Sequence, residues 1–321
     1  MRTPARRPAA IAAASAAIVV AAAISAAGFR MLSRPAPPGQ AGGRGHSPHS
    51  TAPTGRARTS GPHVLTRSPA PSPAPTCSAH AALLAALRPV LRHRTGQLAV
   101  GVTDPGTGVT VTYRPHQAFH TASIVKADIL ATLLLQLQRQ HAGLSLEEQD
   151  LATAMIEESD NGAANELWYT IGATAGLAAG DRVLRLRHTA PGQDDLWGLT
   201  STTVPDQLRL LSDLVSRRSP LTGASRRYEL TLMRGVEPGE NWGVTAAASR
   251  QTRPAVKNGW LPDGPLGLWV INSIGVISHH GQRLLVAVLS SGQPSEQTGI
   301  NQVQAAARAA AAAITKPVCP R

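Results

Sequence analysis

Two groups of β-patterned segments, separated by a long helical block, constrain the fold of this chain more than any other feature. The first group is Gln97–Thr103 and Val109–Tyr113 around an Asp104-Pro105-Gly106 turn, which predicts an antiparallel hairpin. The second group comes much later in the chain: Ala255–Trp260, Leu268–Ser278 and Gln282–Ser291. Both groups can join one antiparallel sheet only if the helical block is an insertion. The predicted fold is therefore α+β with two lobes.

Apolar residues at helical spacing predict the other elements. The predicted helices are Ser78–Arg94, a helix that Thr121 caps and that runs to about Gln140, Ser145–Glu158, Asn161–Ile171, about Val204–Arg217, about Thr222–Gly235, and Gly299–Ile314. A loop rich in Gly, Pro, Thr and Asp occupies Arg187–Thr202. We expect a sheet lobe of residues 77–121 and 250–321 and a helical lobe of residues 122–249. A cleft between two such lobes is a usual place for a ligand site.

The net charge of +12 belongs mostly to the first 76 residues. They hold nine of the 31 basic residues and no Asp or Glu, so residues 77–321 keep 22 basic against 19 acidic residues, a net charge of +3. Aromatic residues make up only 3% of the chain, which leaves few platforms for stacking bases. Nucleic acid is therefore not an expected partner.

The N-terminal 30 residues resemble an export segment. Arg2, Arg6 and Arg7 precede the uncharged run Ala9–Phe29, an order typical of a signal peptide. The run is also long enough to span a membrane as an uncleaved anchor, and both interpretations stay open. Either one places the rest of the chain outside the cytoplasm, secreted or tethered to the outer face of the membrane. A helix buried in a soluble protein is the third interpretation.

Residues 31–76 are rich in Pro, Gly, Ser, Thr and Arg and lack a periodic apolar pattern, which predicts a disordered linker before a folded domain of residues 77–321. Cys77 and Cys319 lie at the two ends of that domain. In an oxidising compartment such a pair tends to form a disulfide, although two free thiols at the termini would fit the same positions.

Ser123-Ile124-Val125-Lys126 begins the most apolar predicted helix. A spacing of three places Ser123 and Lys126 on one helical face. Apolar neighbours would partly desolvate the lysine and lower its pKa. A neutral amine can then take the proton of the hydroxyl and create a serine nucleophile. Taken alone, the pattern also fits a serine at a helix start followed by a solvated lysine.

Two further motifs could complete such a site. Ser159-Asp160-Asn161 lies between two predicted helices, where a hydroxyl and an amide could shuttle a proton and hold a carbonyl. Taken alone, it also fits an ordinary helix cap. Lys257-Asn258-Gly259-Trp260 lies on the first strand of the second group, where the lysine would attract an anion and the glycine would let a substrate approach the strand edge. Taken alone, it also fits a basic residue near the end of a strand.

The order of the three motifs resembles that of class A β-lactamases and penicillin-binding proteins, the penicillin-recognising serine hydrolases. The run Ser159-Asp160-Asn161-Gly162-Ala163-Ala164-Asn165 and the Thr202-Thr203 pair strengthen the resemblance, which covers about Cys77–Ile314. It implies a five-stranded antiparallel sheet flanked by helices, beside an all-helical lobe. It implies no cofactor, and the spacing of His116 and His120 does not predict a metal site.

The resemblance also implies roles for individual residues. Ser123 would be acylated, with Lys126 as its base, and Ser159 would pass a proton to the leaving nitrogen. Lys257 would attract the substrate carboxylate. The expected binding residues are Asn161 for the side-chain amide, Asn258 and Gly259 in the third motif, and Trp260, whose backbone N–H would form the oxyanion hole with that of Ser123.

Three departures from the family pattern matter. Asn258 replaces the usual Thr or Ser, and the segment between Ser123 and Ser159 is short. The loop Arg187–Thr202 also lacks the Glu that activates water in class A enzymes. Asp194 and Asp195 are its only carboxylates and are candidates for that role, although a solvated loop tip fits them as well.

The sequence therefore predicts an exported, monomeric serine hydrolase that opens a β-lactam amide through an acyl-Ser123 intermediate. One alternative is a peptidase that acts on a D-Ala-D-Ala wall peptide. The other is a protein that binds penicillin or cell-wall material without turnover.

Overall fold

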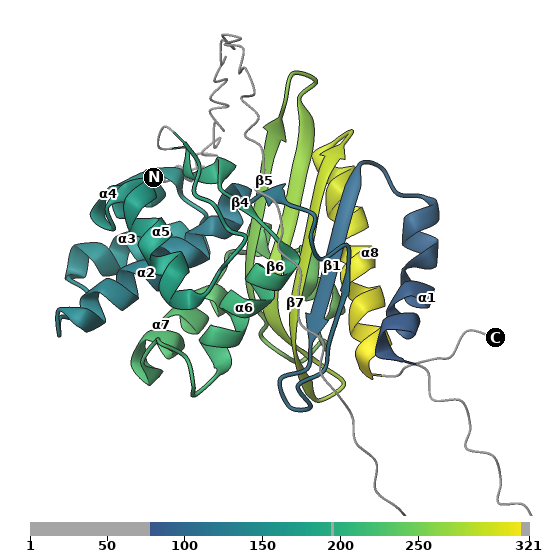
Figure 1. Ribbon diagram of the computed structural model, residues 1–321, viewed down its shortest axis with the longest axis horizontal. Helices are drawn as coiled ribbons and strands as arrows, with labels where there is room; N and C mark the ends of the chain where they lie inside the picture. The colour runs from purple at the N-terminus through teal and green to yellow at the C-terminus, as the bar shows by residue number, and fades with distance from the viewer. Residues whose placement is uncertain (1–77, 194–195, 316–321) are drawn as a thin grey trace, which may run out of the picture. The chain divides into compact units, whose positions relative to one another are not determined.

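The computed structural model describes residues 78–193 and 196–315. Five strands form one antiparallel sheet in the order β2-β1-β7-β6-β5 (Figure 1). The strands are β1 (Gln97–Thr103), β2 (Thr110–Tyr113), β5 (Ala255–Asp263), β6 (Leu268–His279) and β7 (Gln282–Gln293). Central β7 joins the two halves, since Val100 of β1 and Ser273 of β6 both pair with Val288. The predicted α+β fold with a five-stranded antiparallel sheet is confirmed.

Helices α1 (Ala79–Arg92) and α8 (Glu296–Thr315) cover one face of the sheet (Figure 1). The side of α8 that faces the sheet is made of small residues, with Ala306, Ala307, Ala310 and Ala311 all fully buried. Alanine is the strongest helix former and lets the backbones approach closely. Strands β6 and β7 are buried along most of their length, so residues on both faces are buried and simple alternation is absent.

The helical lobe lies on the other side of the sheet (Figure 1). Its helices are α2 (Val125–Arg139), α3 (Leu146–Glu157), α4 (Asn161–Thr170), α5 (Ala173–Leu184), α6 (Val204–Val215) and α7 (Gly223–Arg234). Every residue of α2 from Val125 to Leu135 is buried, so the other helices pack around it. Ser145 and Glu148 cap α3 reciprocally in a capping box.

Short elements connect the two lobes. They are η1 (Ala122–Ile124), η2 (Trp197–Leu199), η3 (Pro238–Glu240), η4 (Gly243–Ala247) and a two-stranded sheet of β3 (Phe119–His120) and β4 (Ser201–Thr202). Val244 and Ala247 of η4 belong to the core that α8 forms with the sheet. The chain therefore returns to the sheet side before residue 250.

Three local differences separate the structure from the sequence predictions. Helix α5 was not predicted, because its Gly176 and Gly180 interrupt an otherwise favourable alanine-rich run. Thr121 does not cap a helix, since its hydroxyl contacts the backbone oxygen of Gly198 and its side chain makes no cap bond. Residues 122–124 form a 3₁₀ turn, so Ser123 precedes the α-helix and does not lie in its first turn.

Several sequence predictions lie outside the described residues. They concern the export segment, the linker, the Cys77–Cys319 pair, and Asp194 and Asp195. Where the structure describes the chain, no helix has both the length and the apolar character needed to cross a membrane.

A pair of buried carboxyl groups joins α2 to α5. Asp128 is 1% exposed and Asp181 3% exposed, and neither carboxyl group accepts a hydrogen bond from another described residue. Burial raises the pKa of Asp128 to about 7, and burial together with the charge of Asp128 raises the pKa of Asp181 further. The pair therefore holds a proton at neutral pH and titrates as a unit.

This pair should make the fold less stable as the pH rises. The unfolded carboxyls ionise near 3.8, while the folded pair keeps its protons to about pH 7. The free energy of unfolding should therefore decline as the pH rises from about 4 to 8. Asp128→Asn should raise it at pH 8 by on the order of 2–4 kcal/mol and flatten the decline.

Urea unfolding at pH 5 and pH 8 measures both effects. The exposed Asp150→Asn on α3 serves as the charge-matched control and should keep the wild-type pH dependence. A wild-type stability that does not change between the two pH values would contradict the shared proton.

Candidate active site

The segment before Ser123 is anchored from two sides. Strand β3 pairs with β4, and the Thr121 N–H donates to the Thr200 oxygen at 2.8 Å. Buried Asn272 of β6 donates from Nδ2 to the His120 oxygen at 2.8 Å and to the Thr121 oxygen at 3.0 Å. Ala122 then adopts a left-handed φ of 49°, which is uncommon for a residue other than glycine. These contacts fix the turn that presents Ser123.

Strand β5 passes directly over this turn. A Cβ built on Gly259 would lie 2.7 Å from the backbone nitrogens of both Ser123 and Ile124. No side chain fits at this position, which explains the glycine of the third motif. The backbone of β5 beside Gly259 and the N–H of Ser123 thus border the same narrow space.

Lys126 is completely buried and makes three hydrogen bonds. Its Nζ donates to the Ser159 oxygen at 2.6 Å, to Asn161 Oδ1 at 2.7 Å and to Ser159 Oγ at 3.3 Å. Burial and the nearby charge of Lys257 lower the pKa of Lys126 to about 6, although Glu240 and Asp160 partly oppose the shift. The amine is therefore mostly neutral at pH 7 and can accept a proton.

Ser159 lies between the two lysines. Lys257, 1% exposed on β5, donates from Nζ to Ser159 Oγ at 2.8 Å and to its neighbour's backbone oxygen, Asn258 O, at 3.2 Å. Ser159 has a left-handed φ of 57° where the chain turns from α3 into α4. Asp160 caps α4 by accepting from the Ala163 N–H at 2.7 Å. The second motif thus combines a helix cap with a hydroxyl shared by two amines.

Glu240 of η3 supplies negative charge near both lysines, and sequence reasoning missed it. Burial raises the pKa of the Glu240 carboxyl. Burial also lowers the pKa of Lys257 to about 8, and the charge of Glu240 partly opposes this fall. Because η3 lies 17 residues before Lys257 in the chain, only the fold brings the two side chains together.

The structure does not present Asn258 to the cleft as predicted. Asn258 is 1% exposed, and its Nδ2 donates to the backbone oxygens of Glu240 at 2.6 Å and Trp242 at 3.2 Å. Both amide hydrogens are therefore used to hold the segment that carries Glu240. The Asn258 amide therefore holds this segment in place and does not donate to a substrate carboxylate as predicted.

Trp197 packs beside Lys126. The centre of its indole ring lies 5.0 Å from Lys126 Nζ, and its Nε1 donates to Asn165 Oδ1 at 2.8 Å. Asn165 belongs to the extended second motif, whereas none of the three motifs includes Trp197. The indole lies in the loop where a water-activating carboxylate was expected.

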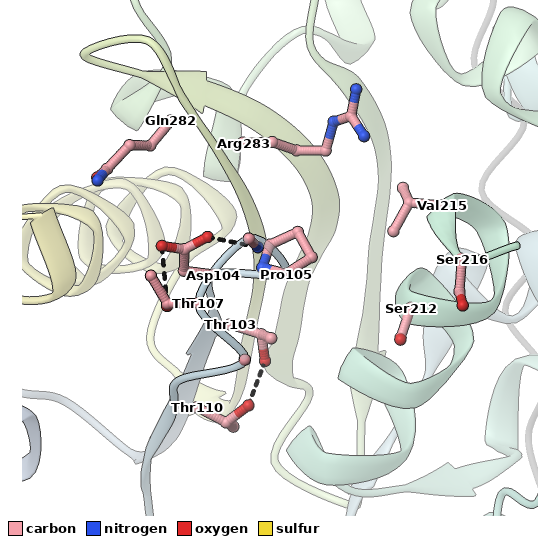
Figure 2. A pocket seen from close by; sticks show the side chains of 12 residues that line it. Thr103, Asp104, Pro105, Thr107, Thr110, Ser212, Val215, Ser216, Gln282 and Arg283 are labelled. Atoms are coloured by element: carbon pink, nitrogen blue, oxygen red, sulfur yellow. Dashed lines mark hydrogen bonds between the residues drawn. The ribbon is translucent and has the colours of Figure 1, made fainter. Parts of the chain in front are cut away.

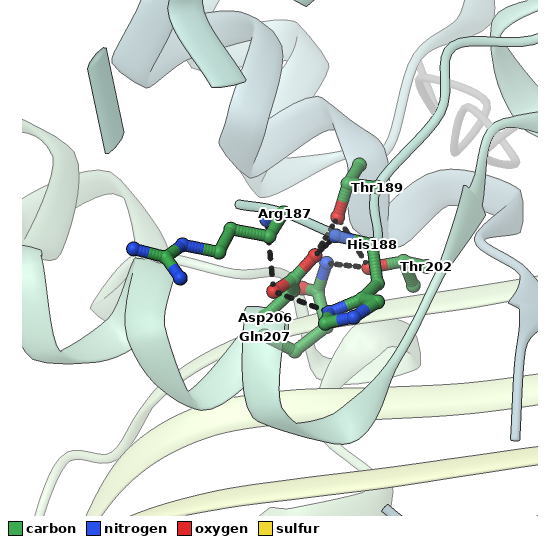
Figure 3. A network of polar contacts seen from close by, with 6 residues as sticks. All are labelled: Arg187, His188, Thr189, Thr202, Asp206 and Gln207. Carbon is green, nitrogen blue, oxygen red and sulfur yellow. Dashed lines mark hydrogen bonds and ion pairs between the residues drawn. The ribbon is translucent and has the colours of Figure 1, made fainter. Parts of the chain in front are cut away.

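Asp206 of α6 holds the start of this loop (Figure 3). Its carboxylate accepts from the backbone N–H of Arg187 at 3.2 Å and of His188 at 2.7 Å, and from Thr189 Oγ1 at 2.9 Å. The Thr189 hydroxyl contacts Thr202 Oγ1 at 2.9 Å. These bonds fix both ends of the loop segment that contains Trp197.

The remaining predicted residues lie along the same cleft. Asn161 accepts from Lys126, while Trp260 packs edge-to-face against Trp242 with ring centres 5.9 Å apart. His120 Nδ1 lies 2.7 Å from Asp263 Oδ2 and ties the segment before Ser123 to the end of β5. Ser159, Lys126, Lys257 and Asn161 are in direct contact, and Ser123 lies under β5 beside them. The arrangement has the parts of an acyl-transfer site: a serine, a neutral amine and a shared hydroxyl.

The two site lysines should titrate far below an ordinary lysine. The chain holds only three lysines, Lys126, Lys257 and Lys316, so a ¹³C-lysine NMR titration resolves each of them. We expect a pKa of about 6 for Lys126 and about 8 for Lys257. Glu240→Gln removes a negative charge that favours both ammonium forms, so both pKa values should fall further.

Glu166→Gln, an exposed substitution on α4, is the matched control and should leave both titrations unchanged. A Lys126 signal that titrates near 10 would contradict the buried neutral amine.

Comparison with known proteins agrees with this geometry. The model of the Beta-lactamase enzyme family matches residues 134–314, a segment that contains Ser159 and Lys257 and begins after Ser123 and Lys126. The Mycobacterium tuberculosis protein named "Putative lipoprotein LppW" is 30% identical over 210 residues, 62% of this chain and 64% of that protein. The chain thus spans just under two thirds of LppW.

Other matches are to named β-lactamases. The carbapenem-hydrolyzing β-lactamase KPC of Klebsiella oxytoca is 31% identical over 121 residues, 28% of this chain and 41% of that protein. The structure of the TLA-1 extended-spectrum β-lactamase superposes with a TM-score of 0.67 at 15% identity, covering 74% of this chain and all of that one. A class A β-lactamase from Bacteroides cellulosilyticus gives a TM-score of 0.65 at 14% identity, covering 74% of this chain and 99% of that one. The fold is that of class A β-lactamases, and because the family model matches more than half of its length, this chain belongs to the β-lactamase enzyme family.

Proposed function

We propose that this protein is a serine hydrolase that opens β-lactam amides through an acyl-Ser123 intermediate. The observation that carries the proposal is the Ser159 hydroxyl, which contacts Lys126 Nζ at 3.3 Å and Lys257 Nζ at 2.8 Å. A neutral Lys126 can take the Ser123 proton, and the shared hydroxyl gives that proton a short path towards the leaving nitrogen.

The proposed acylation follows from this arrangement. Ser123 Oγ attacks the lactam carbonyl while its proton moves to Lys126. Ser159 then relays a proton to the lactam nitrogen as the C–N bond breaks, leaving an ester on Ser123. The backbone N–H groups of Ser123 and Trp260 would hold the oxyanion. Protonated Lys257 would attract the substrate carboxylate, and Asn161 would bind the side-chain amide.

Deacylation is the step for which the described residues offer the fewest candidate catalytic groups. Water must attack the ester, and a general base usually takes its proton. Trp197 presents an apolar ring beside Lys126 in the loop that carries this base in class A enzymes. We assign the base role to Asp194 or Asp195 of the same loop and expect deacylation to limit turnover. The Trp197 ring favours one alternative, a penicillin-binding protein without turnover.

The proposed place of action is outside the cytoplasm. The basic and then apolar N-terminus supports this placement, as does the lipoprotein designation in the name of LppW. No Cys lies near the end of the apolar run, so anchoring of this chain would depend on the run itself and not on an attached lipid.

Covalent labelling tests the nucleophile. A fluorescent penicillin should label the wild-type protein, and Ser123→Ala should abolish the label because the ester oxygen is lost. Ser212→Ala, on α6 away from the cleft, removes a hydroxyl from a half-buried site and should keep the label. Nitrocefin should then give a burst of one equivalent followed by slow steady turnover. A correctly folded Ser123→Ala protein that still carries the label would exclude the proposed intermediate.

Substitution of the two loop carboxylates tests the assigned base. Asp194→Asn combined with Asp195→Asn should leave the burst intact and lower the steady rate by on the order of 10²-fold or more, because a general base typically contributes that much. Full steady-state turnover in this double variant would exclude both residues. A burst with no turnover in the wild type would favour the penicillin-binding alternative, and D-Ala release from a D-Ala-D-Ala peptide would favour a peptidase.

A further inference from the structure

A cavity lined by arginines lies between α6, α7 and the β6–β7 pair, away from the proposed active site. It has a volume of about 220 Å³, and Leu214, Val215, Leu230 and Val276 form its apolar wall. Five arginines line it: Arg217, Arg226, Arg227, Arg234 and Arg283. Its lining contains no Asp or Glu, so the cavity concentrates positive charge.

These arginines have no internal counter-ion. The ion pairs among the described residues are His120–Asp263, His188–Asp206 and Arg209–Asp213, none of which includes an arginine of the cavity. Glu229 of α7 is fully buried, burial raises its pKa, and it forms no ion pair with an arginine of the cavity. No ion pair among the described residues therefore compensates the positive charge of the cavity.

The start of α7 adds to this charge. A Cβ built on Gly223, the first residue of α7, would lie 3.3 Å from Arg227 Nη1 and 3.7 Å from Arg226 Nη2. Both guanidinium groups thus lie over the first turn of the helix, where the helix dipole is positive. Arg226 Nε is buried and has no hydrogen-bond partner. Arg226 is half-buried and Arg227 is exposed, so this turn presents positive charge that favours an anion.

A second cavity, rich in hydroxyl groups, adjoins the first. It has a volume of about 810 Å³ and shares Val215 and Arg283 with the arginine cavity. Figure 2 shows Arg283 reaching from β7 towards Val215 of α6. The hydroxyls in its lining belong to Thr103, Thr107, Thr110, Ser212 and Ser216.

The carboxylate in this lining is already engaged. Asp104 accepts from the Gly106 N–H at 2.8 Å and from Thr107 Oγ1 at 3.0 Å within its own turn (Figure 2). These bonds hold the carboxylate within its own turn, although its negative charge remains. The second cavity can offer neutral hydrogen bonds beside the guanidinium groups of the first.

We propose that the two cavities form one binding site for a phosphorylated polyol, with the phosphate among the arginines and the hydroxylated part against the threonines and serines. Guanidinium groups bind phosphate oxygens in bidentate geometry, and several of them hold a dianion better than they hold a carboxylate. Neither cavity is lined by Ser123, Lys126, Ser159 or Lys257, so this site is independent of acyl chemistry.

Calorimetric titration of the whole protein with glycerol 3-phosphate at low ionic strength tests the proposal. We expect binding that is tighter than that of inorganic phosphate, no binding of glycerol, and weakening as salt is added. Arg227→Ala and Arg283→Ala should each weaken binding on the order of tenfold. Arg88→Ala removes the same charge from exposed α1 and should have no effect.

Several outcomes would overturn the proposal. Absence of glycerol 3-phosphate binding, or binding unchanged in both cavity variants, would exclude the site. Equal binding of inorganic phosphate would exclude the polyol part. Binding to phosphatidylglycerol vesicles without binding to glycerol 3-phosphate would make the arginines a membrane-facing surface instead. The substitutions lie on exposed side chains, and unchanged thermal midpoints would show that both variants are folded.

Discussion

The burial of two lysines against one serine hydroxyl is the constraint on which the site depends. Taking an ammonium group out of water costs several kcal/mol unless hydrogen bonds and opposite charge replace the solvent. Here Lys126 Nζ donates to the backbone oxygen of Ser159, to Asn161 Oδ1 and to Ser159 Oγ. Lys257 Nζ donates to the backbone oxygen of Asn258 and to Ser159 Oγ. These partners are mostly neutral, so the balance lowers the pKa of both amines.

Contacts from neighbouring elements hold this arrangement in place. Ala122 and Ser159 both adopt left-handed conformations, each costing on the order of 1 kcal/mol or more. They persist because neighbouring elements leave no alternative: Asn272 and β4 fix the first turn, and the cap of α4 fixes the second. The first of these residues precedes Ser123, whose backbone lies against Gly259, and the second is Ser159, whose hydroxyl contacts both lysines.

Local sequence patterns predicted the parts of the site that depend on near neighbours. The serine and lysine of the first motif are three residues apart, and the two groups of strands are short apolar segments bounded by turns. Glu240, Trp197 and Asn272 escaped prediction because their role comes from contacts between distant segments. Asn258 was assigned to the substrate because its motif position suggested a donor, whereas the fold supplies two backbone acceptors at 2.6 Å and 3.2 Å. Thr121 was expected to cap a helix, but the loop ending at Thr200 offered its backbone another partner.

The pairing of β1 with β7 has a consequence for how the chain reaches this state. Val100 and Val288 lie next to each other in the sheet but are separated by the whole helical lobe in the sequence. Contacts of such high sequence separation require closure of a long loop before they contribute any stability, which slows folding. The helical lobe can collapse around α2 from local contacts, whereas the sheet must wait for the C-terminal strands. Until then the edge of β1 stays unpaired, so a newly synthesised chain spends its most aggregation-prone interval before β7 is inserted.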